Sequence, residues 1–134
     1  MSTIQHLNPA GMAHNPAFSQ AVSVAGQHKT IYVGGQDAVD AAGNIVGRGD
    51  IAAQTRQIFA NLKLALAAGG ADLEHIVKWN VFVVQGQDVR PGLAVFQEEW
   101  GARAEPPAIS VMFVAALAHP DFLAEIDAVA VVPE

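Results

Sequence analysis

Two carboxylate side chains lie close together in an apolar segment near the end of the chain. Glu125 and Asp127 are set in the run Leu123–Val132, which is otherwise mostly alanine, valine and isoleucine and is too short for a good helix. In a strand, residues two apart share one face, with Cβ atoms roughly 7 Å apart. Two charged groups on one face of an apolar strand make this segment the first candidate for chemistry.

Glu125 has two roles that the sequence leaves open. We expect its carboxylate to be partly buried among Ile126, Val111 and Phe113, where a carboxyl group could transfer a proton near neutral pH. The alternative is a structural carboxylate, bonded to backbone amides or to an arginine of another copy of the chain, because perturbed carboxylates are common in both roles. For Asp127 we expect a structural or solvated role.

The other residue types that often carry catalysis indicate neither thiol nor metal chemistry. The chain has no cysteine, which excludes disulfides and thiol nucleophiles. The five histidines lack the spacing of metal ligands and are predicted to be surface or turn residues: His6, His14, His28, His75 and His119. We therefore expect neither a metal nor a cofactor.

Composition predicts one acidic domain, residues 1–134, that associates with itself. Hydrophobic residues make up 51% of the chain and charged residues 15%, so more apolar surface is expected than a lone monomer needs. A formal charge of -6 opposes binding to nucleic acid or anionic membranes. The N-terminus lacks the build of a signal peptide and no apolar run could cross a bilayer, so the expected location is the cytoplasm.

The first half of the chain predicts strands followed by a helix. A short strand is expected at 4–7, and strands at 18–25 and 30–35 are expected to pair as a hairpin. The paired glycines Gly34 and Gly35 indicate a bulge or a close approach by another group. Asp50 caps a predicted amphipathic helix over residues 50–68, which ends at Gly69-Gly70.

The second half continues the alternation. A central strand is predicted at 76–84, and a helix beginning near Asp88 carries Leu93, Phe96 and Trp100 on its inner face. Two strands follow, within 105–114 and 123–132. The pattern predicts an α+β fold with two helices packed on one face of a single sheet.

These residues resemble the RidA/YjgF family over nearly the whole chain. The motifs are Phe18-Ser19-Gln20-Ala21, Gly34-Gly35-Gln36, residues 49–57, Asn61-Leu62, Gly70-Ala71-Asp72-Leu73, Val77-Lys78, Pro106-Pro107-Ala108 and residues 125–130. The resemblance implies a chorismate-mutase-like fold and a homotrimer whose sheets face a central barrel, with ligand clefts between subunits. It also implies hydrolysis of reactive enamines and imines without metal or cofactor.

The resemblance implies a cleft that has lost polar groups. In the core branch of the family an arginine after the Pro-Ala pair holds the substrate carboxylate, and here that position is Ile109. An aliphatic side chain cannot pair with a carboxylate, and an unpartnered charge in a cleft is costly. Phe18 and Leu93 stand where the resemblance leads us to expect tyrosine and asparagine, and Gly34 stands for serine. The implied substrate-binding residues are Phe18, Gly35, Leu93, Ile109 and Val111.

Glu125 matches the family's glutamate, which by the resemblance orders the water that attacks the imine. The first hypothesis is therefore a trimeric hydrolase or deaminase whose substrate lacks a carboxylate or presents it elsewhere. The second is a non-catalytic trimer that binds a small molecule or a partner. A third, ribonuclease activity, is opposed by the acidic charge. Arg103, in the loop before the last two strands, is a candidate for the missing cation.

Overall fold

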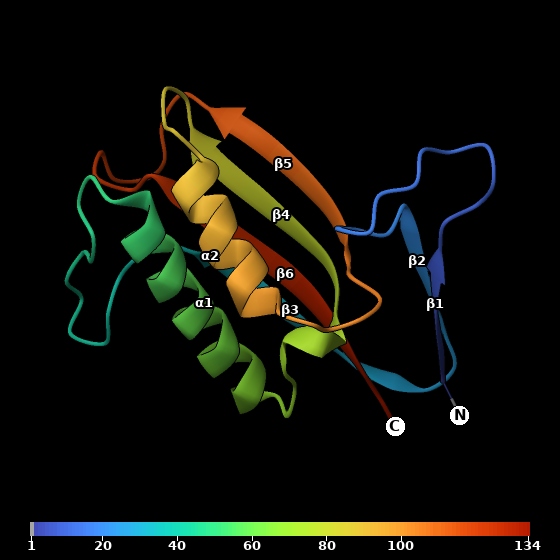
Figure 1. The fold of residues 1–134 in the computed structure, drawn as a ribbon. Coiled ribbons are helices and arrows are strands. Elements are labelled where there is room, and N and C mark those ends of the chain that lie inside the picture. The colour runs from blue at the N-terminus through green and yellow to red at the C-terminus, as the bar shows by residue number, and fades with distance from the viewer. Residues whose placement is uncertain (1) are drawn as a thin grey trace.

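The chain folds as two helices against one face of a mixed sheet, with a separate two-stranded arm (Figure 1). The computed structural model describes residues 2–134. Its elements are β1 (Thr3–Leu7), β2 (Ala21–Ala25), β3 (His28–Gln36), α1 (Ile51–Ala68), the short 3₁₀ helix η1 (Leu73–His75), β4 (Ile76–Val84), α2 (Arg90–Trp100), β5 (Ala108–Val114) and β6 (Ala124–Pro133). The predicted α+β class is confirmed.

The main sheet places the last strand of the chain in its interior. The strand order is β3-β6-β4-β5, with β4 and β5 parallel and the other pairs antiparallel. Helix α2 makes the crossover between the parallel strands, as parallel pairing requires. Because β6 lies between β3 and β4, Glu125 and Asp127 have neighbours on both sides, and the Cα register pairs them with Phe82 and Asn80 of β4.

The predicted hairpin between the second and third strands is wrong. β2 pairs with β1 in a small sheet of its own, and β3 pairs with β6 instead, so the prediction of a single sheet fails for this arm. The arm is held to the rest of the fold by buried Ser19, whose hydroxyl donates to the carbonyl of Pro106 at 2.6 Å while His6 Nδ1 lies 3.0 Å from the same hydroxyl. The local sequence pattern predicts where the strands lie, but contacts between distant segments determine which strands pair.

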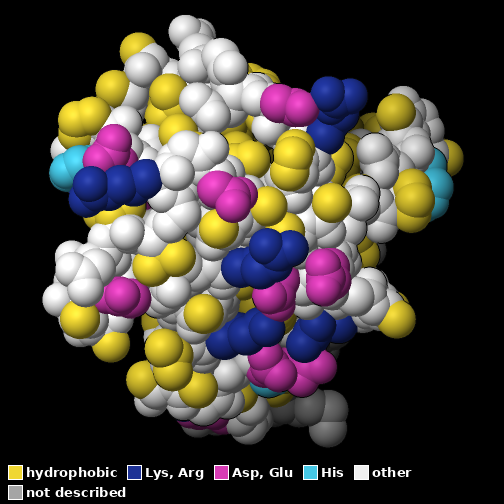
Figure 2. Space-filling view, turned by 60° about the vertical axis from the view of Figure 1, so that its left-hand side comes forward, with side chains coloured by type: hydrophobic (Ala, Val, Ile, Leu, Met, Phe, Trp, Pro, Cys, Tyr) yellow, Lys and Arg dark blue, Asp and Glu magenta, His cyan; other side chains and the backbone are white. Residues whose placement is uncertain are grey.

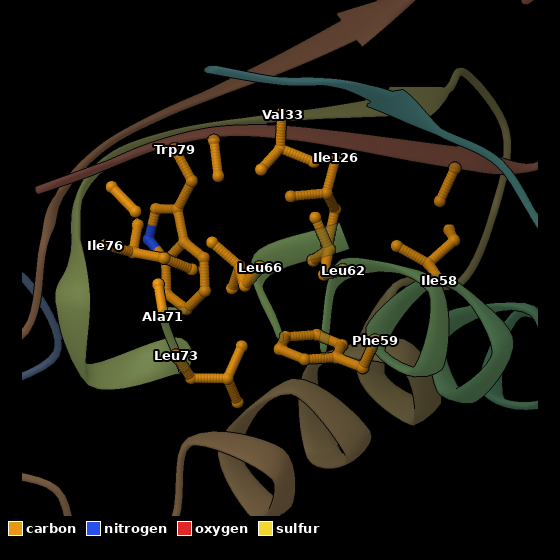
Figure 3. Packing of buried hydrophobic residues seen from close by; sticks show 13 residues of the cluster. Val33, Ile58, Phe59, Leu62, Leu66, Ala71, Leu73, Ile76, Trp79 and Ile126 are labelled. Carbon is orange, nitrogen blue, oxygen red and sulfur yellow. The ribbon is translucent and has the colours of Figure 1, made fainter. Parts of the chain in front are cut away.

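The core fills the space between the helices and the sheet. Figure 3 shows Phe59, Leu62 and Leu66 of α1 pointing toward Trp79 of β4 and Ile126 of β6. The Trp79 ring packs edge-on against Phe59 with ring centroids 6.1 Å apart, so this tryptophan serves the core. Helix α1 begins as predicted, because the Asp50 side chain accepts a hydrogen bond from the Ala53 amide.

Leu62 gives the direct test of this core. We expect Leu62→Ala to lower the free energy of unfolding by about 2–5 kcal/mol, because Leu62 is fully buried and the substitution leaves a cavity. Leu64→Ala is the matched control on the same helix, since Leu64 is 71% exposed and its loss should cost less than about 0.5 kcal/mol. Urea unfolding followed by circular dichroism measures both. Equal losses would contradict the assigned packing.

The opposite face of the sheet lies away from both helices and carries several polar side chains. On this face Lys78 Nζ donates to Ser110 Oγ at 2.7 Å, and Asn80 Nδ2 donates to Asp127 Oδ1 at 2.8 Å. The structural role expected for Asp127 is therefore supported by its bond to Asn80. Tyr32, on β3, is 80% exposed. A sheet with one face so open is a surface on which another chain could pack.

Candidate functional site

An apolar cavity of about 280 Å³ lies between the helices and the sheet. Its walls come from α1 and α2 on one side and from β4, β5 and β6 on the other. Ile109, Val111 and Phe113 line it together because alternate residues of β5 share a face. Leu93 lines the cavity as well and is 51% exposed, so the inner face of the helix on which it was predicted borders this cavity rather than the packed core. The cavity is suited to a hydrocarbon or aromatic group.

No charged side chain is among the described residues that line this cavity. Thr55 contributes a hydroxyl, but that hydroxyl donates to the Ile51 carbonyl at 2.7 Å. The proposed replacement cation is elsewhere: Arg103 Nη1 donates to the carbonyls of Glu99 and Trp100 at 3.1 and 2.9 Å. Arg103 thus satisfies the C-terminus of α2, where a cation is favourable, and the hypothesis that it faces Ile109 is wrong within this chain.

A second hollow, of about 540 Å³, opens beside the loop after β3. One side of it is lined by residues 35–37 and 39–41, and α1 contributes Gln57, Asn61 and Leu64. Asn61 Nδ2 donates to the backbone carbonyls of Asp37 and Val39 at 3.1 and 2.9 Å, and Gln57 donates to Asn61 Oδ1 at 2.9 Å. Helix α1 therefore holds the loop in place through amide side chains.

Glu125 lies against the backbone of Gly35, which is one of the residues that line this hollow. A Cβ atom on Gly35 would stand 2.5 Å from Glu125 Oε2 and 2.7 Å from its Cδ, distances that real Cβ atoms do not show. The register between β3 and β6 shifts between Val33 and Gln36, which confirms the predicted bulge. Gly35 thus lies at the bulge, and because it has no side chain it lets the Glu125 carboxylate approach the backbone closely.

Asp37 forms a hydrogen-bonded pair with Glu125 that the sequence did not indicate. Burial, the side-chain hydrogen bond to Glu125 and repulsion from its charge together raise the pKa of Asp37 to about 7. Oδ1 of Asp37 is buried, and within residues 2–134 it has no hydrogen-bond partner. The pair therefore keeps one proton between two carboxyl groups near neutral pH.

Comparison with known proteins identifies the family. The sequence profile of the family described as Endoribonuclease L-PSP matches residues 10–132. The chain belongs to this endoribonuclease L-PSP (RidA) family. Relatives include the protein DfrA of Myxococcus xanthus, 36% identical over 94% of this chain and 92% of its own. Human 2-iminobutanoate/2-iminopropanoate deaminase is 30% identical over 85% of this chain and 79% of its own.

Solved structures of the endoribonuclease L-PSP family show the same fold. The Rid-family protein YyfB from Yersinia pestis superposes with a TM-score of 0.82 at 34% identity, covering 95% of this chain and 97% of its own. Yeast Mmf1 gives a TM-score of 0.70 at 26% identity, covering 98% of this chain and 100% of its own. The two helices on a mixed sheet are thus the fold of the RidA family.

The predicted site residues of this RidA-family chain fall into two groups on opposite faces of the sheet. Leu93, Ile109 and Val111 line the apolar cavity, whereas Gly35 lines the second hollow and contacts Glu125, which lines neither hollow. Their roles in binding and catalysis stay predictions. Phe18 is half-buried in the segment between β1 and β2 and lines neither hollow.

The expected surroundings of Glu125 are wrong. Ile126 lines the apolar cavity together with Val111 and Phe113, and Glu125, one residue away on the strand, lies on the other face. The neighbour of its carboxylate is instead Asp37, from a segment that the sequence predicts only as a polar loop. A carboxylate soon after a glycine bulge is a weak signal, and pairing with Glu125 required the tertiary fold.

Acidic and basic side chains are interspersed on the face of the molecule shown in Figure 2. Within residues 2–134 no group of three or more histidine, aspartate or glutamate side chains is placed to hold a metal ion. Of the helices in this same range, none combines the length and apolar character needed to cross a membrane.

Proposed function

We propose that this RidA-family protein is a homotrimeric hydrolase of enamines or imines whose substrates carry an apolar group where other family members bind a carboxylate. The observation that carries this proposal is the cavity around Ile109, which is lined by hydrocarbon and holds no charged side chain among the described residues. Burying a carboxylate against such walls is unfavourable, while burying an alkyl or aryl group contributes about 25 cal/mol per Å² of apolar surface.

The positions of the apolar cavity and of Glu125 support assembly of several copies of the chain. Within one chain the cavity with Ile109 and the carboxylate of Glu125 are on opposite faces of the sheet, so one chain does not hold a complete site. Val111 and Phe113 are 54% and 56% exposed, and Tyr32, on the sheet face away from the helices, is 80% exposed. If the sheet face that carries Glu125 in one copy packed near the cavity of another copy, the two would complete a cleft with one apolar wall and one acidic wall.

Glu125 supplies the chemistry in this proposal. Its carboxylate accepts a proton from water as the water oxygen bonds to the imine carbon, and it passes this proton to the nitrogen, which gives a neutral carbinolamine. The carboxylate then takes the proton of the carbinolamine hydroxyl and delivers it to the nitrogen as the C–N bond breaks, and the products are a carbonyl compound and an amine or ammonia. The residue returns to its starting state, and the walls around Ile109 select the substituent on the carbon.

The alternative is a non-catalytic trimer that binds a small apolar molecule. The absence of charged groups from the described lining of the cavity favours this reading equally, because such walls bind a ligand without polarising it. The two proposals differ in one measurement, which is turnover by the intact assembly.

The experiment compares two imines. We expect the purified protein, with the mass of three chains by light scattering, to accelerate hydrolysis of N-benzylidenebutylamine at least 10-fold more than hydrolysis of 2-iminopropanoate, because Ile109 replaces the cation that a carboxylate needs. Absorbance of the aryl imine and ammonia release report the two reactions above background.

Two outcomes would contradict this expectation. Rapid ammonia release from 2-iminopropanoate would overturn the assigned specificity. Saturable binding of the aryl imine with no hydrolysis above background would favour the non-catalytic alternative.

A further inference from the structure

The carboxyl group of Asp37 contacts that of Glu125, although the proposed reaction requires only one carboxylate. Water activation needs one carboxylate, yet the fold brings a second carboxyl group into hydrogen-bond contact with the first. The two residues come from the loop after β3 and from β6, so their meeting depends on the pairing of these strands. A pair of like charges is retained in a folded protein only if a proton or a cation offsets the repulsion.

The position of Asp37 is held by its own backbone. Its carbonyl accepts hydrogen bonds from the Val39 amide at 2.8 Å and from Asn61 Nδ2 at 3.1 Å. The next residue, Ala38, is fully buried and anchors the loop. On the other side, Gly35 leaves space for the Glu125 carboxylate. Backbone movement that would separate the two carboxyl groups is thereby opposed.

Among the described residues no basic side chain forms an ion pair with Asp37 or Glu125. Lys78 of β4 lies on the same face of the sheet as Glu125 but donates to Ser110 Oγ at 2.7 Å. On β6 the neighbouring titratable group is Asp127, which is bonded to Asn80. In the loop it is Asp40, whose Oδ1 accepts from the amides of Ala42 and Asn44 at 3.0 and 2.9 Å. Helix α1 presents uncharged Gln57, Asn61 and Leu64 to the hollow. A proton shared within the pair is therefore the charge compensation that this environment supplies.

We propose that Asp37 is a positioning residue for Glu125: it keeps a proton and donates it in a hydrogen bond that holds the Glu125 carboxylate against Gly35, oriented toward the attacking water. This inference rests on the proposed function for its catalytic consequence. Asp37 does not transfer its proton to the substrate. It remains protonated while Glu125 takes a proton from water and passes it to the departing nitrogen.

The shared proton gives the reaction a pH dependence. Below the Asp37 pKa of about 7 the pair carries one negative charge, and above it the pair carries two charges that repel each other. Glu125 then loses its hydrogen-bond donor and its fixed position. Turnover per site should fall about 10-fold between pH 6 and pH 8, after subtraction of the uncatalysed reaction, as expected for loss of a single proton near pH 7.

Three variants of the full chain test the inference. Asp37→Asn keeps an N–H donor that does not ionise, so activity on N-benzylidenebutylamine at pH 6 should stay within about threefold of wild type and the fall toward pH 8 should vanish. Asp37→Ala removes the donor and should lower activity at both pH values. Asp40→Asn, a control at the same hollow, should keep the fall between pH 6 and pH 8.

Carbon-13 NMR of the side-chain carboxyl groups tests the pair without any substrate. We expect the Asp37 carboxyl carbon to titrate near pH 7 in the wild type and at least one pH unit lower in Glu125→Gln, because the amide carries no charge to repel Asp37. An Asp37 midpoint below pH 5 in the wild type, or one that Glu125→Gln leaves unchanged, overturns the inference whether or not the imine is hydrolysed.

The two proposals can fail separately. If Asp37 titrates as expected but no variant hydrolyses the imine, the proposed function fails and the shared proton is established. If hydrolysis occurs and the Asp37→Asn variant keeps the wild-type fall between pH 6 and pH 8, the positioning role is overturned and the proposed function stands.

Discussion

Glu125→Gln is expected to reduce hydrolysis of N-benzylidenebutylamine by roughly 10²–10⁴-fold, the usual contribution of a positioned general base. Glutamine has nearly the shape of glutamate and can occupy the same space beside Gly35, but its amide cannot accept a proton from water. The expected loss is in kcat, with little change in KM, because in the proposed cleft the substrate's apolar group binds at the opposite wall around Ile109.

The controls for this variant separate chemistry from structure. The mass by light scattering and the circular dichroism spectrum should match those of the wild type, since the substitution leaves the apolar core unchanged. Asp127→Asn, on the same face of β6, should retain most of the activity because Asp127 is bonded to Asn80. Wild-type turnover by Glu125→Gln would remove the water-activating role from this residue.

Gly35→Ala is expected to lower activity at least 10-fold without adding or removing a charge. The new Cβ would come within 2.5 Å of Glu125 Oε2, so the carboxylate must leave its position against the backbone. A displacement of about 1 Å in a catalytic group is sufficient for a loss of rate of roughly 10²-fold. In the carbon-13 experiment the Asp37 midpoint should also fall, because the hydrogen bond to Glu125 would be weakened.

Gly34→Ala is the matched control. A Cβ at Gly34 meets no atom within 4 Å in the described chain, and neither glycine has a positive φ that would strain alanine. We expect the Gly34 variant to stay within about twofold of the wild type in kcat and KM. Equal losses from the two substitutions would show that the strand, rather than the contact with Glu125, is responsible.

The local pattern of the chain predicts its elements well. Residues 76–84 are β-branched, aromatic and apolar, and β4 occupies this range. The Asp50 cap and Gly69 bound α1 as predicted, because capping depends on groups within one turn of the helix end. The fold class follows from this order of strands and helices, and the bulge at Gly34-Gly35 follows from the glycines themselves.

The candidate site could be predicted only in part. Ile109 and Val111 are predicted to bind substrate, and both line the apolar cavity because they alternate along β5, while their role in binding stays a prediction. The surroundings of Glu125 could not be predicted by assembling nearby apolar residues, since its side chain lies on the face opposite Ile126. Arg103 has the charge that the cavity lacks, yet the carbonyls at the end of α2 hold it.

Residue order thus establishes which segments become helices and strands, which side chains share a face, and that Ile109 offers no cation. These properties depend on periodicity and on contacts within a few residues. The insertion of β6 between β3 and β4, the pairing of β2 with β1, and the meeting of Asp37 with Glu125 are decided by the folded chain. Each joins distant segments, and the partner of a strand or a carboxylate depends on burial and hydrogen bonding over the whole fold.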